Sequence, residues 1–243
     1  MAFAIFPIGG KGERFEKAGY REPKPLIKIF GRSQLEWSIL SCIHNYPDFQ
    51  IVIGCREELL PEIKELTDVL SKRLNIEVIV LNVGKATLGA AHTIKIALEL
   101  LEQNSKEFKF LVLDNDVAIN MPNKSRFENG EAGLVITNSA NPAHSFVIID
   151  DNQNVRKIAE KEVISEQGVV GNYFFKSRKS YLDAYKRITN SNAEQYISEI
   201  IKVLLDAGKS ICAESALTVV SYGTPEEIDG LSKESLKFLD NLI

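Results

Sequence analysis

Short apolar runs alternate along the chain with longer segments in which apolar residues recur at helical spacing. This alternation is typical of parallel strands joined by helices that pack on both faces of a sheet. The expected elements are strands over residues 2–8, 50–55, 76–81 and 108–113, and helices over residues 33–45, 57–74 and 88–103. The fold class is therefore α/β, with a Rossmann-like, mostly parallel central sheet flanked by helices.

The pattern changes after Asp116, where residues 117–131 are polar and rich in Asn and predict an excursion from the sheet. The later elements expected are antiparallel or mixed strands over 133–140, 144–161 and 168–176, helices over 177–189 and 193–207, a strand over 211–220 and a helix from about 225. Because no repeat or long linker interrupts the chain, we expect one domain over residues 1–243, with halves over 1–116 and 117–243.

Composition narrows the class of protein. Of the 243 residues, 44% are hydrophobic and 26% are charged, which is typical of a globular protein with a sizeable core. The net charge of −4 argues against nucleic acid and anionic membranes as partners. The apolar start of the chain is too short to span a membrane and lacks the basic segment of a secretory signal.

Cysteine and histidine add little chemistry. Cys42, Cys55 and Cys212 lie in separate apolar runs, which predicts reduced core thiols and favours a cytoplasmic location. The three histidines lie far apart in the sequence, without the spacing of a zinc site, and we assign them no role.

The stretch "GGKGERF" at residues 9–15 follows the first predicted strand directly. Three glycines within four positions allow backbone N–H groups to approach an anion, and Lys11 and Arg14 add positive charge. The dinucleotide fingerprint is weak here because it needs a further glycine, and the P-loop ending Gly-Lys-Ser/Thr is absent. A loop that binds phosphate in another way is the remaining interpretation.

A second cationic position follows shortly afterwards in "EPKPLIKIFG". Pro23 and Pro25 restrict the backbone on both sides of Lys24, so its ammonium is presented in a fixed direction. A rigidly held ammonium suits a phosphoryl group. Together the two segments favour a phosphate site over a solvated turn.

These segments resemble the N-terminal signature of the sugar-phosphate nucleotidyltransferases, or nucleotide-sugar pyrophosphorylases, which is G-x-G-x-R followed by P-K-P-L. The signature residues here are Gly10, Gly12, Arg14, Pro23, Lys24, Pro25 and Leu26. Weaker similarities continue in "ATLGAAHTIKIAL", "FLVLDNDVAI", "IAEKEVIS", "VVGNYFFK" and "SYGTPEEI". The resemblance covers about residues 3 to 230.

The resemblance implies an enzyme in which a phosphomonoester oxygen attacks the α-phosphorus of a nucleoside triphosphate and releases pyrophosphate. The loop of Gly9, Gly10, Lys11 and Gly12 would receive the triphosphate. Arg14 would hold the leaving phosphates, and Lys24 would neutralise the α-phosphate and the incoming phosphate. Such a displacement depends on in-line placement and positive charge.

The resemblance also implies a metal and a base site. We assign Asp116 to Mg²⁺ and Asp114 to the ribose or to a secondary ligand role, while Gly89 would lie against the base. Many family members carry a second metal-binding aspartate where this chain has Ser221, so the number of metal ions stays open. The base stays open among CTP, UTP and dTTP.

For the phosphorylated acceptor, the resemblance implies Glu160, Lys161, Gly171 and Asn172. Glu160 and Lys161 are adjacent and would point to opposite sides of an extended strand, so a bend is needed to bring both to one ligand. The stretch "NAEQYI" could add Glu194 or Tyr196, although a capping residue and a core aromatic explain it nearly as well.

We expect the acceptor to be a sugar 1-phosphate, used for capsule or other surface polysaccharide. The alternatives are a CTP-dependent cytidylyltransferase for phosphocholine or a phosphorylated amino acid or amide, and a catalytically silent nucleotide-binding regulator. The regulator is suggested by Ser221 and by Glu13, which adds negative charge beside the loop. A homodimer is a candidate assembly, but the sequence does not fix the oligomeric state.

Overall fold

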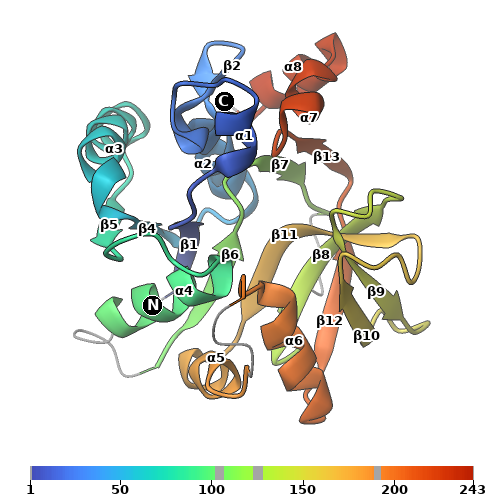
Figure 1. The fold of residues 1–243 in the computed structure, drawn as a ribbon. Helices are drawn as coiled ribbons and strands as arrows, with labels where there is room; N and C mark the ends of the chain where they lie inside the picture. The colour runs from blue at the N-terminus through green and yellow to red at the C-terminus, as the bar shows by residue number, and fades with distance from the viewer. Residues whose placement is uncertain (1, 102–106, 123–127, 189–192, 243) are drawn as a thin grey trace.

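The computed structural model describes residues 2–101, 107–122, 128–188 and 193–242 (Figure 1). Its centre is the strand β1 (Ala2–Ile8), which pairs in parallel with β4 (Gln50–Cys55) and β6 (Lys109–Leu113). The strand β5 (Val78–Asn82) pairs in parallel with β4 at the edge of the sheet. The parallel half of the sheet predicted from the apolar runs is therefore confirmed.

The second half of the sheet is mixed, as predicted. The strand β11 (Gln167–Phe175) pairs antiparallel with β6 and with β8 (Ala132–Asn138), and so joins the two halves into one nine-stranded sheet. The other strands of this half are β9 (Ser145–Ile149), β10 (Val155–Glu160) and β12 (Ile211–Ser215). The strand β10 pairs antiparallel with β9, and β12 runs parallel to β8.

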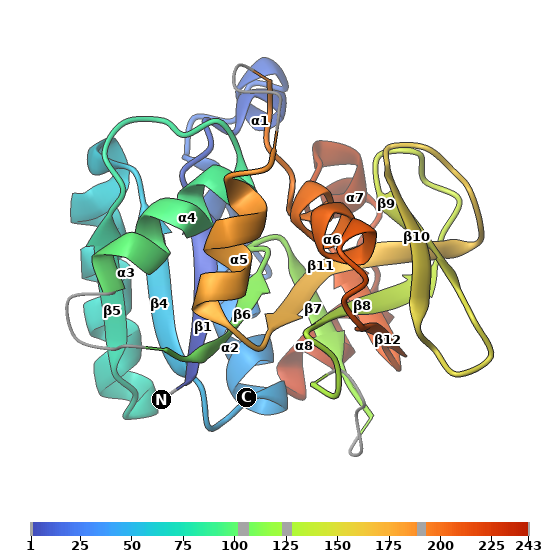
Figure 2. The same ribbon diagram turned by 90° about the horizontal axis from the view of Figure 1, so that it is seen from below.

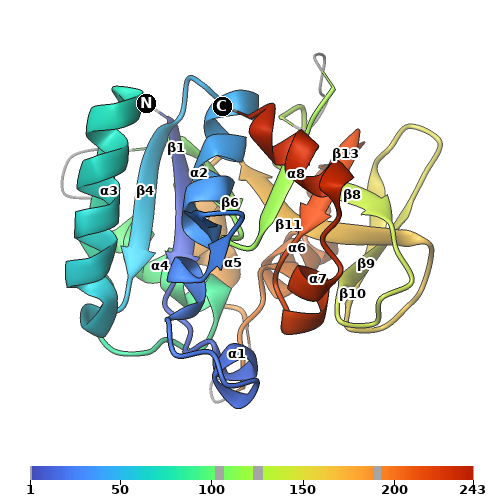
Figure 3. The same cartoon turned by 90° about the horizontal axis from the view of Figure 1, so that it is seen from above.

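Helices cover both faces of the sheet (Figures 2 and 3). One face carries α4 (Ala90–Leu101), α5 (Arg178–Tyr185) and α6 (Ile197–Asp206). The opposite face carries α2 (Gln34–Asn45) and α3 (Leu60–Leu74). Because β1 is buried on both faces, its sequence is a continuous apolar run and not an alternation.

The short elements lie around this framework. They are α1 (Glu13–Lys17), the 3₁₀ turns η1 (Lys24–Leu26) and η2 (Glu57–Leu59), the strands β2 (Lys28–Ile29) and β3 (Arg32–Ser33), and the helices α7 (Pro225–Asp229) and α8 (Lys233–Asp240). The helix predicted from residue 225 is thus two helices. The predicted ends at 102–103 and at 189 lie outside the described residues.

The chain leaves the nine-stranded sheet after Asp116, as predicted, but the segment contains a strand that was not expected. Residues Val117–Asn120 form β7, which pairs antiparallel with β13 (Thr218–Ser221) in a separate two-stranded sheet. The strand expected over 211–220 is split between β12 and β13, because the backbone at Leu217 leaves the large sheet and donates to Asn120 O. A third apolar cluster forms here between α2, β7, β13 and α8.

The helix predicted over 193–207 begins only at Ile197. Before it, the backbone of Gln195 accepts from Ala91 N and donates to Leu88 O, at 3.1 and 2.7 Å. These bonds hold Gln195 beside the start of α4, and Tyr196 is extended. A contact between distant segments therefore overrides the local helical pattern.

The cysteines are free, as predicted, with Cys42 and Cys55 buried and Cys212 half-buried. Burial raises the pKa of the Cys42 and Cys55 thiols to about 12. Among the described residues, no helix is both long and apolar enough to cross a membrane.

Candidate active site

The glycine loop leaves β1 at the carboxyl edge of the parallel strands, where ligands of open α/β sheets bind. Gly12 has a φ of +75°, in the left-handed region, and precedes the short helix α1. A Cβ added at Gly12 would lie 3.2 Å from Lys24 Cβ. The loop and the proline-flanked lysine are therefore packed against each other.

The predicted cationic residues line one cavity, which also contains the glycine loop. Lys24 Nζ lies 2.5 Å from Asp116 Oδ2 and 5.8 Å from the centroid of the Phe15 ring. Arg14 and Lys11 lie on the wall of the same cavity, with Lys11 exposed. The structure thus brings together the loop, its arginine and the lysine between the prolines.

Asp114 and Asp116 follow β6 and line the cavity. Burial, helped by the charges of Asp116 and Glu160 and opposed by that of Lys24, raises the pKa of Asp114 to about 8. Asp114 N donates to Gly171 O at 2.9 Å. Gly171 has a φ of +75°, and a Cβ there would lie only 2.1 Å from Asp114 Oδ2, so this contact requires glycine.

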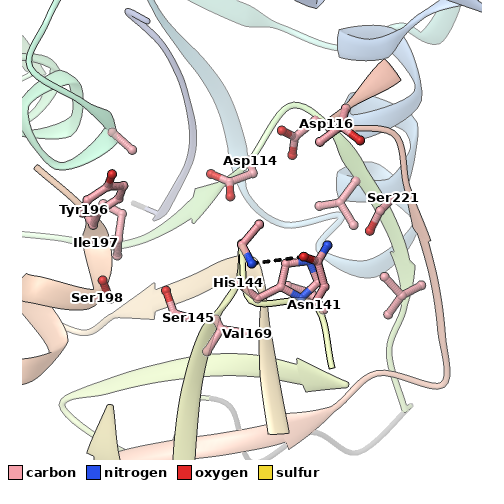
Figure 4. Close-up of a pocket in the computed structure, with 18 of the residues that line it drawn as sticks. Asp114, Asp116, Asn141, His144, Ser145, Val169, Tyr196, Ile197, Ser198 and Ser221 are labelled. Carbon is pink, nitrogen blue, oxygen red and sulfur yellow. Dashed lines mark hydrogen bonds between the residues drawn. The ribbon is translucent and has the colours of Figure 1, made fainter. Parts of the chain in front are cut away.

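The two aspartates offer the oxygen donors that Mg²⁺ prefers. Oδ2 of Asp116 is engaged by Lys24, whereas no described residue bonds its other oxygen. Nowhere in the described part of the chain do three or more His, Cys, Asp or Glu side chains form a metal-binding group. Mg²⁺ needs only one or two carboxylates when phosphates and water complete its shell, so this donor set fits the ion. Ser221 lines the adjoining hollow near Asp116 (Figure 4).

The expected bend at Glu160 and Lys161 is present. The strand β10 ends at Glu160, and Lys161 takes a φ of +54°. Lys161 N donates to His144 O at 3.1 Å, which fixes this turn. Both side chains line the same cavity as the glycine loop.

Glu160 is positioned by two serines that the sequence analysis missed. Ser198 Oγ donates to Glu160 Oε2 at 2.6 Å, and Ser145 Oγ donates to the same oxygen. Ser145 starts β9 and Ser198 lies in the first turn of α6. No local signal marks either serine, because their partner is distant in the sequence.

The open question about "NAEQYI" is answered by the contacts of Tyr196, which lines the cavity. Lys161 Nζ donates to Tyr196 OH at 2.5 Å and lies 4.3 Å from the centroid of its ring. Tyr196 OH donates to Glu194, whose Oε2 is 3.7 Å from Lys161 Nζ. These residues therefore form part of the cavity wall.

Asn172 lies differently from the expectation, and Gly89 has a further structural role. Asn172 is 5% exposed and lines neither hollow, whereas its neighbours Gly171 and Tyr173 line one of them. Gly89 lines the cavity, but a Cβ there would lie 2.5 Å from Gln195 O. The absence of a side chain at Gly89 is thus required by the protein backbone itself.

Three further cavity residues were missed. Arg56 follows β4 at the same edge of the sheet, a position that could have indicated it. Asn115, between the two aspartates, has a buried Nδ2 with no hydrogen-bond partner in the described part of the protein. His144 lines the hollow next to Glu160, and its Nδ1 lies 3.0 Å from Ser139 Oγ.

These residues surround two adjoining hollows that share Arg14, Asp114, Asp116, Glu160 and Tyr196. In Figure 4, Asp114 lies between Tyr196 on one side and Asp116 with Ser221 on the other, with His144 and Ser145 below. To this shared set one hollow adds the glycine loop, Lys11, Lys24, Arg56 and Lys161, and the other adds Ser145, Ser198, Ser221 and Glu227. The arrangement can hold a phosphate chain beside a second polar ligand.

A mixed sheet with this cleft at the carboxyl edge of its parallel strands defines an α/β protein of the nucleotidyltransferase fold. The model of the nucleotidyl transferase family matches residues 4–216. The chain therefore belongs to the nucleotidyl transferase family, which confirms the predicted family and class of enzyme.

Among the curated relatives that match are two proteins named bifunctional protein GlmU, from two strains of Clostridium kluyveri. Each is 25% identical over 226 residues, which cover 86% of this chain and 46% of the relative. The chain thus spans about half the length of the curated relatives it matches.

Solved structures share the fold. A nucleoside-diphosphate-sugar pyrophosphorylase from Vibrio cholerae RC9 superposes with a TM-score of 0.82 at 23% identity, covering 93% of this chain and 98% of that one. An inositol-1-phosphate CTP transferase from T. maritima gives a TM-score of 0.74 at 17% identity, covering 99% and 95%. At these identities the likeness shows the fold alone.

Proposed function

We propose that this chain transfers a nucleotidyl group from a nucleoside triphosphate to a small phosphomonoester and releases pyrophosphate. The observation that carries the proposal is the cavity in which the glycine loop, Arg14 and Lys24 meet Asp116, continuous with the hollow around Glu160. Cations at one end suit the triphosphate, and a second polar hollow suits an acceptor.

The chain's own residues position the substrates and supply positive charge. The N–H groups of Gly10, Lys11 and Gly12 and the guanidinium of Arg14 bind the β- and γ-phosphates, which leave as pyrophosphate. Lys24 stabilises the negative charge that builds on the α-phosphate as the acceptor oxygen attacks. Little acid–base chemistry is needed, because a phosphomonoester oxygen is already an anion.

Asp116 is the residue that would hold Mg²⁺, with Asp114 beside it. The ion, when bound, neutralises phosphate charge. Lys24 keeps one oxygen of Asp116 in place through their ion pair, so lysine and aspartate are positioned by each other.

Lys161 is suited to the acceptor phosphate, because it lines the cation-lined hollow together with Glu160. Glu160 is suited to acceptor hydroxyls or an amine, since two serines orient one of its oxygens. A sugar 1-phosphate fits this pattern. We accordingly propose a role in surface or capsular polysaccharide synthesis, in the cytoplasm, by a single domain of residues 1–243.

The test is to incubate the protein with each NTP, Mg²⁺ and a panel of sugar 1-phosphates, phosphocholine and phosphorylated amino acids. Pyrophosphate release is assayed and products are identified by mass spectrometry. A mass equal to nucleoside monophosphate joined to one acceptor is the expected result. NTP binding without pyrophosphate release across the panel would instead identify a silent regulator, and binding of NAD(P) alone would contradict both.

A further inference from the structure

Arg56 lies on the cavity wall next to the glycine loop. It directly follows β4, and its backbone N–H donates to Ile8 O, the last residue of β1, at 3.4 Å. Its side chain lines the same cavity as Gly10 and Lys24. Arg56 is therefore held at the carboxyl edge of the sheet, one strand away from the glycine loop.

The guanidinium of Arg56 has few hydrogen-bond partners, although it is largely buried. Its side chain is 16% exposed, and its buried Nε makes no hydrogen bond to any residue that the structure describes. The nearest carboxylate oxygen, Glu58 Oε2, is 3.6 Å from Nε and belongs to a side chain that is 59% exposed. By contrast, Arg32 and Arg73 both bond the buried Glu36. A nearly buried donor without an acceptor costs free energy, which a ligand acceptor would recover.

The order of the strands indicates which part of a nucleotide reaches Arg56. The sequence of neighbours is β6, β1, β4, so Asp116 lies on one side of the glycine loop and Arg56 on the other. When Lys24 and Asp116 hold the phosphates, the hollow at the Glu160 end remains free for the acceptor. The nucleoside is then directed towards β4, where Leu59 and Ile8 give the cavity an apolar wall suited to the face of a base.

We propose that Arg56 reads the base of the nucleotide and selects cytosine. The proposal rests on the function proposed above. A guanidinium only donates hydrogen bonds, and its fork matches two adjacent acceptors. Cytosine offers N3 and O2 side by side, whereas uracil and thymine carry an N3–H donor between their two carbonyls. Guanine offers O6 and N7 on its other edge, so GTP is the critical competitor.

The experiment is equilibrium binding by isothermal titration calorimetry, with Mg²⁺ and without acceptor, of CTP, UTP, dTTP and GTP to the full chain. Wild-type protein is expected to bind CTP about tenfold or more tightly than the others, the range of one bidentate contact. Arg56→Lys keeps the charge and removes the fork, so it is expected to erase the CTP preference. CMP and UMP should show the same pattern, because the contact is to the base.

The matched control is Arg156→Lys, an exposed arginine on β10 whose replacement should leave all affinities unchanged. Arg56→Met, which keeps the length of the apolar stem, should weaken CTP binding further, and thermal melting shows whether it folds. Equal weakening of every NTP by Arg56→Lys, an unchanged CTP preference, or tighter binding of GTP would each overturn the proposal. If no NTP bound the wild-type protein, the proposed function itself would fail.

Discussion

The two ends of the cleft differ both in charge and in the way the chain builds them. The end next to the glycine loop presents Lys11, Lys24, Arg56 and Lys161, while Arg14 lines both ends. The end around Glu160 presents carboxylates, serine hydroxyls and tyrosines. This difference orients the substrates, because the excess of positive charge at the first end stabilises a triphosphate and the second end suits a hydroxyl-rich or amine-bearing group.

The largest effect is expected at the cationic end, from Lys24→Ala. Its ammonium is preorganised by Pro23, Pro25 and Asp116. Loss of a preorganised donor beside developing charge typically lowers the rate by about 10²- to 10³-fold. Steady-state pyrophosphate release measures this, with kcat expected to fall more than the affinity for NTP.

The control is Lys28→Ala, an exposed lysine on β2 that lines neither hollow. It should retain wild-type turnover. Circular dichroism should show both variants folded. If Lys24→Ala retained turnover, Lys24 would have no role in the reaction.

The next largest effect is a loss of stability, expected from Gly171→Ala at the junction of the two ends. The added Cβ would collide with Asp114, and alanine is strained at a φ of +75°. The strain alone costs about 1–2 kcal/mol, and forced overpacking adds about 1–3 kcal/mol. We expect the free energy of unfolding in urea to fall by roughly 2–5 kcal/mol.

Gly208→Ala separates the two causes, because Gly208 has a φ of +71° but open space where the Cβ would lie. It should lose only the strain contribution. Equal losses in the two variants would show that the contact with Asp114 has no energetic consequence.

The cationic end was largely predictable because one short segment supplies most of it. Gly9 to Gly12, Arg14 and Lys24 lie within 16 positions of each other, so their spacing is visible as a motif. Arg56 was missed although it also follows a strand. A lone charge after an apolar run looks like an ordinary exposed residue, and only its burial distinguishes it.

The end around Glu160 was harder to predict because its parts are scattered. Ser145 and Ser198 meet Glu160 only through the packing of β9, β10 and α6. The pairing of β11 with β8 shifts between Val169 and Tyr173, so the side that Asn172 faces could not be assigned from its sequence number. The strand β7 was not predicted for a similar reason, since Ile119 pairs with Val219, which lies 100 residues later.

A moderate effect specific to the Glu160 end is expected from Ser198→Ala. It removes one of the two hydroxyls that orient the Glu160 carboxylate, while Ser145 still holds the same oxygen. We expect the KM for the acceptor to rise about 3- to 10-fold, the effect of one ordinary hydrogen bond of about 0.5–1.5 kcal/mol, because Ser145 still holds the carboxylate. Affinity for NTP, measured by calorimetry, should stay unchanged. Ser210→Ala, an exposed serine outside both hollows, is the control.

The smallest effect is expected from Lys11→Ala, at the cationic end. Lys11 and Lys24 line one cavity, but their side chains are held in place to different degrees. Lys11 is exposed, whereas Lys24 is paired and held between prolines. An exposed charge contributes about 0.2–1 kcal/mol, so Lys11→Ala should raise the KM for NTP only about 2- to 5-fold. Salt screens such a contribution, and the difference from wild type should shrink as NaCl increases, as a titration of KM against ionic strength would show. A loss as large as that of Lys24→Ala, insensitive to salt, would mean that the loop closes over the phosphates and that exposure in the free protein does not decide which cation acts.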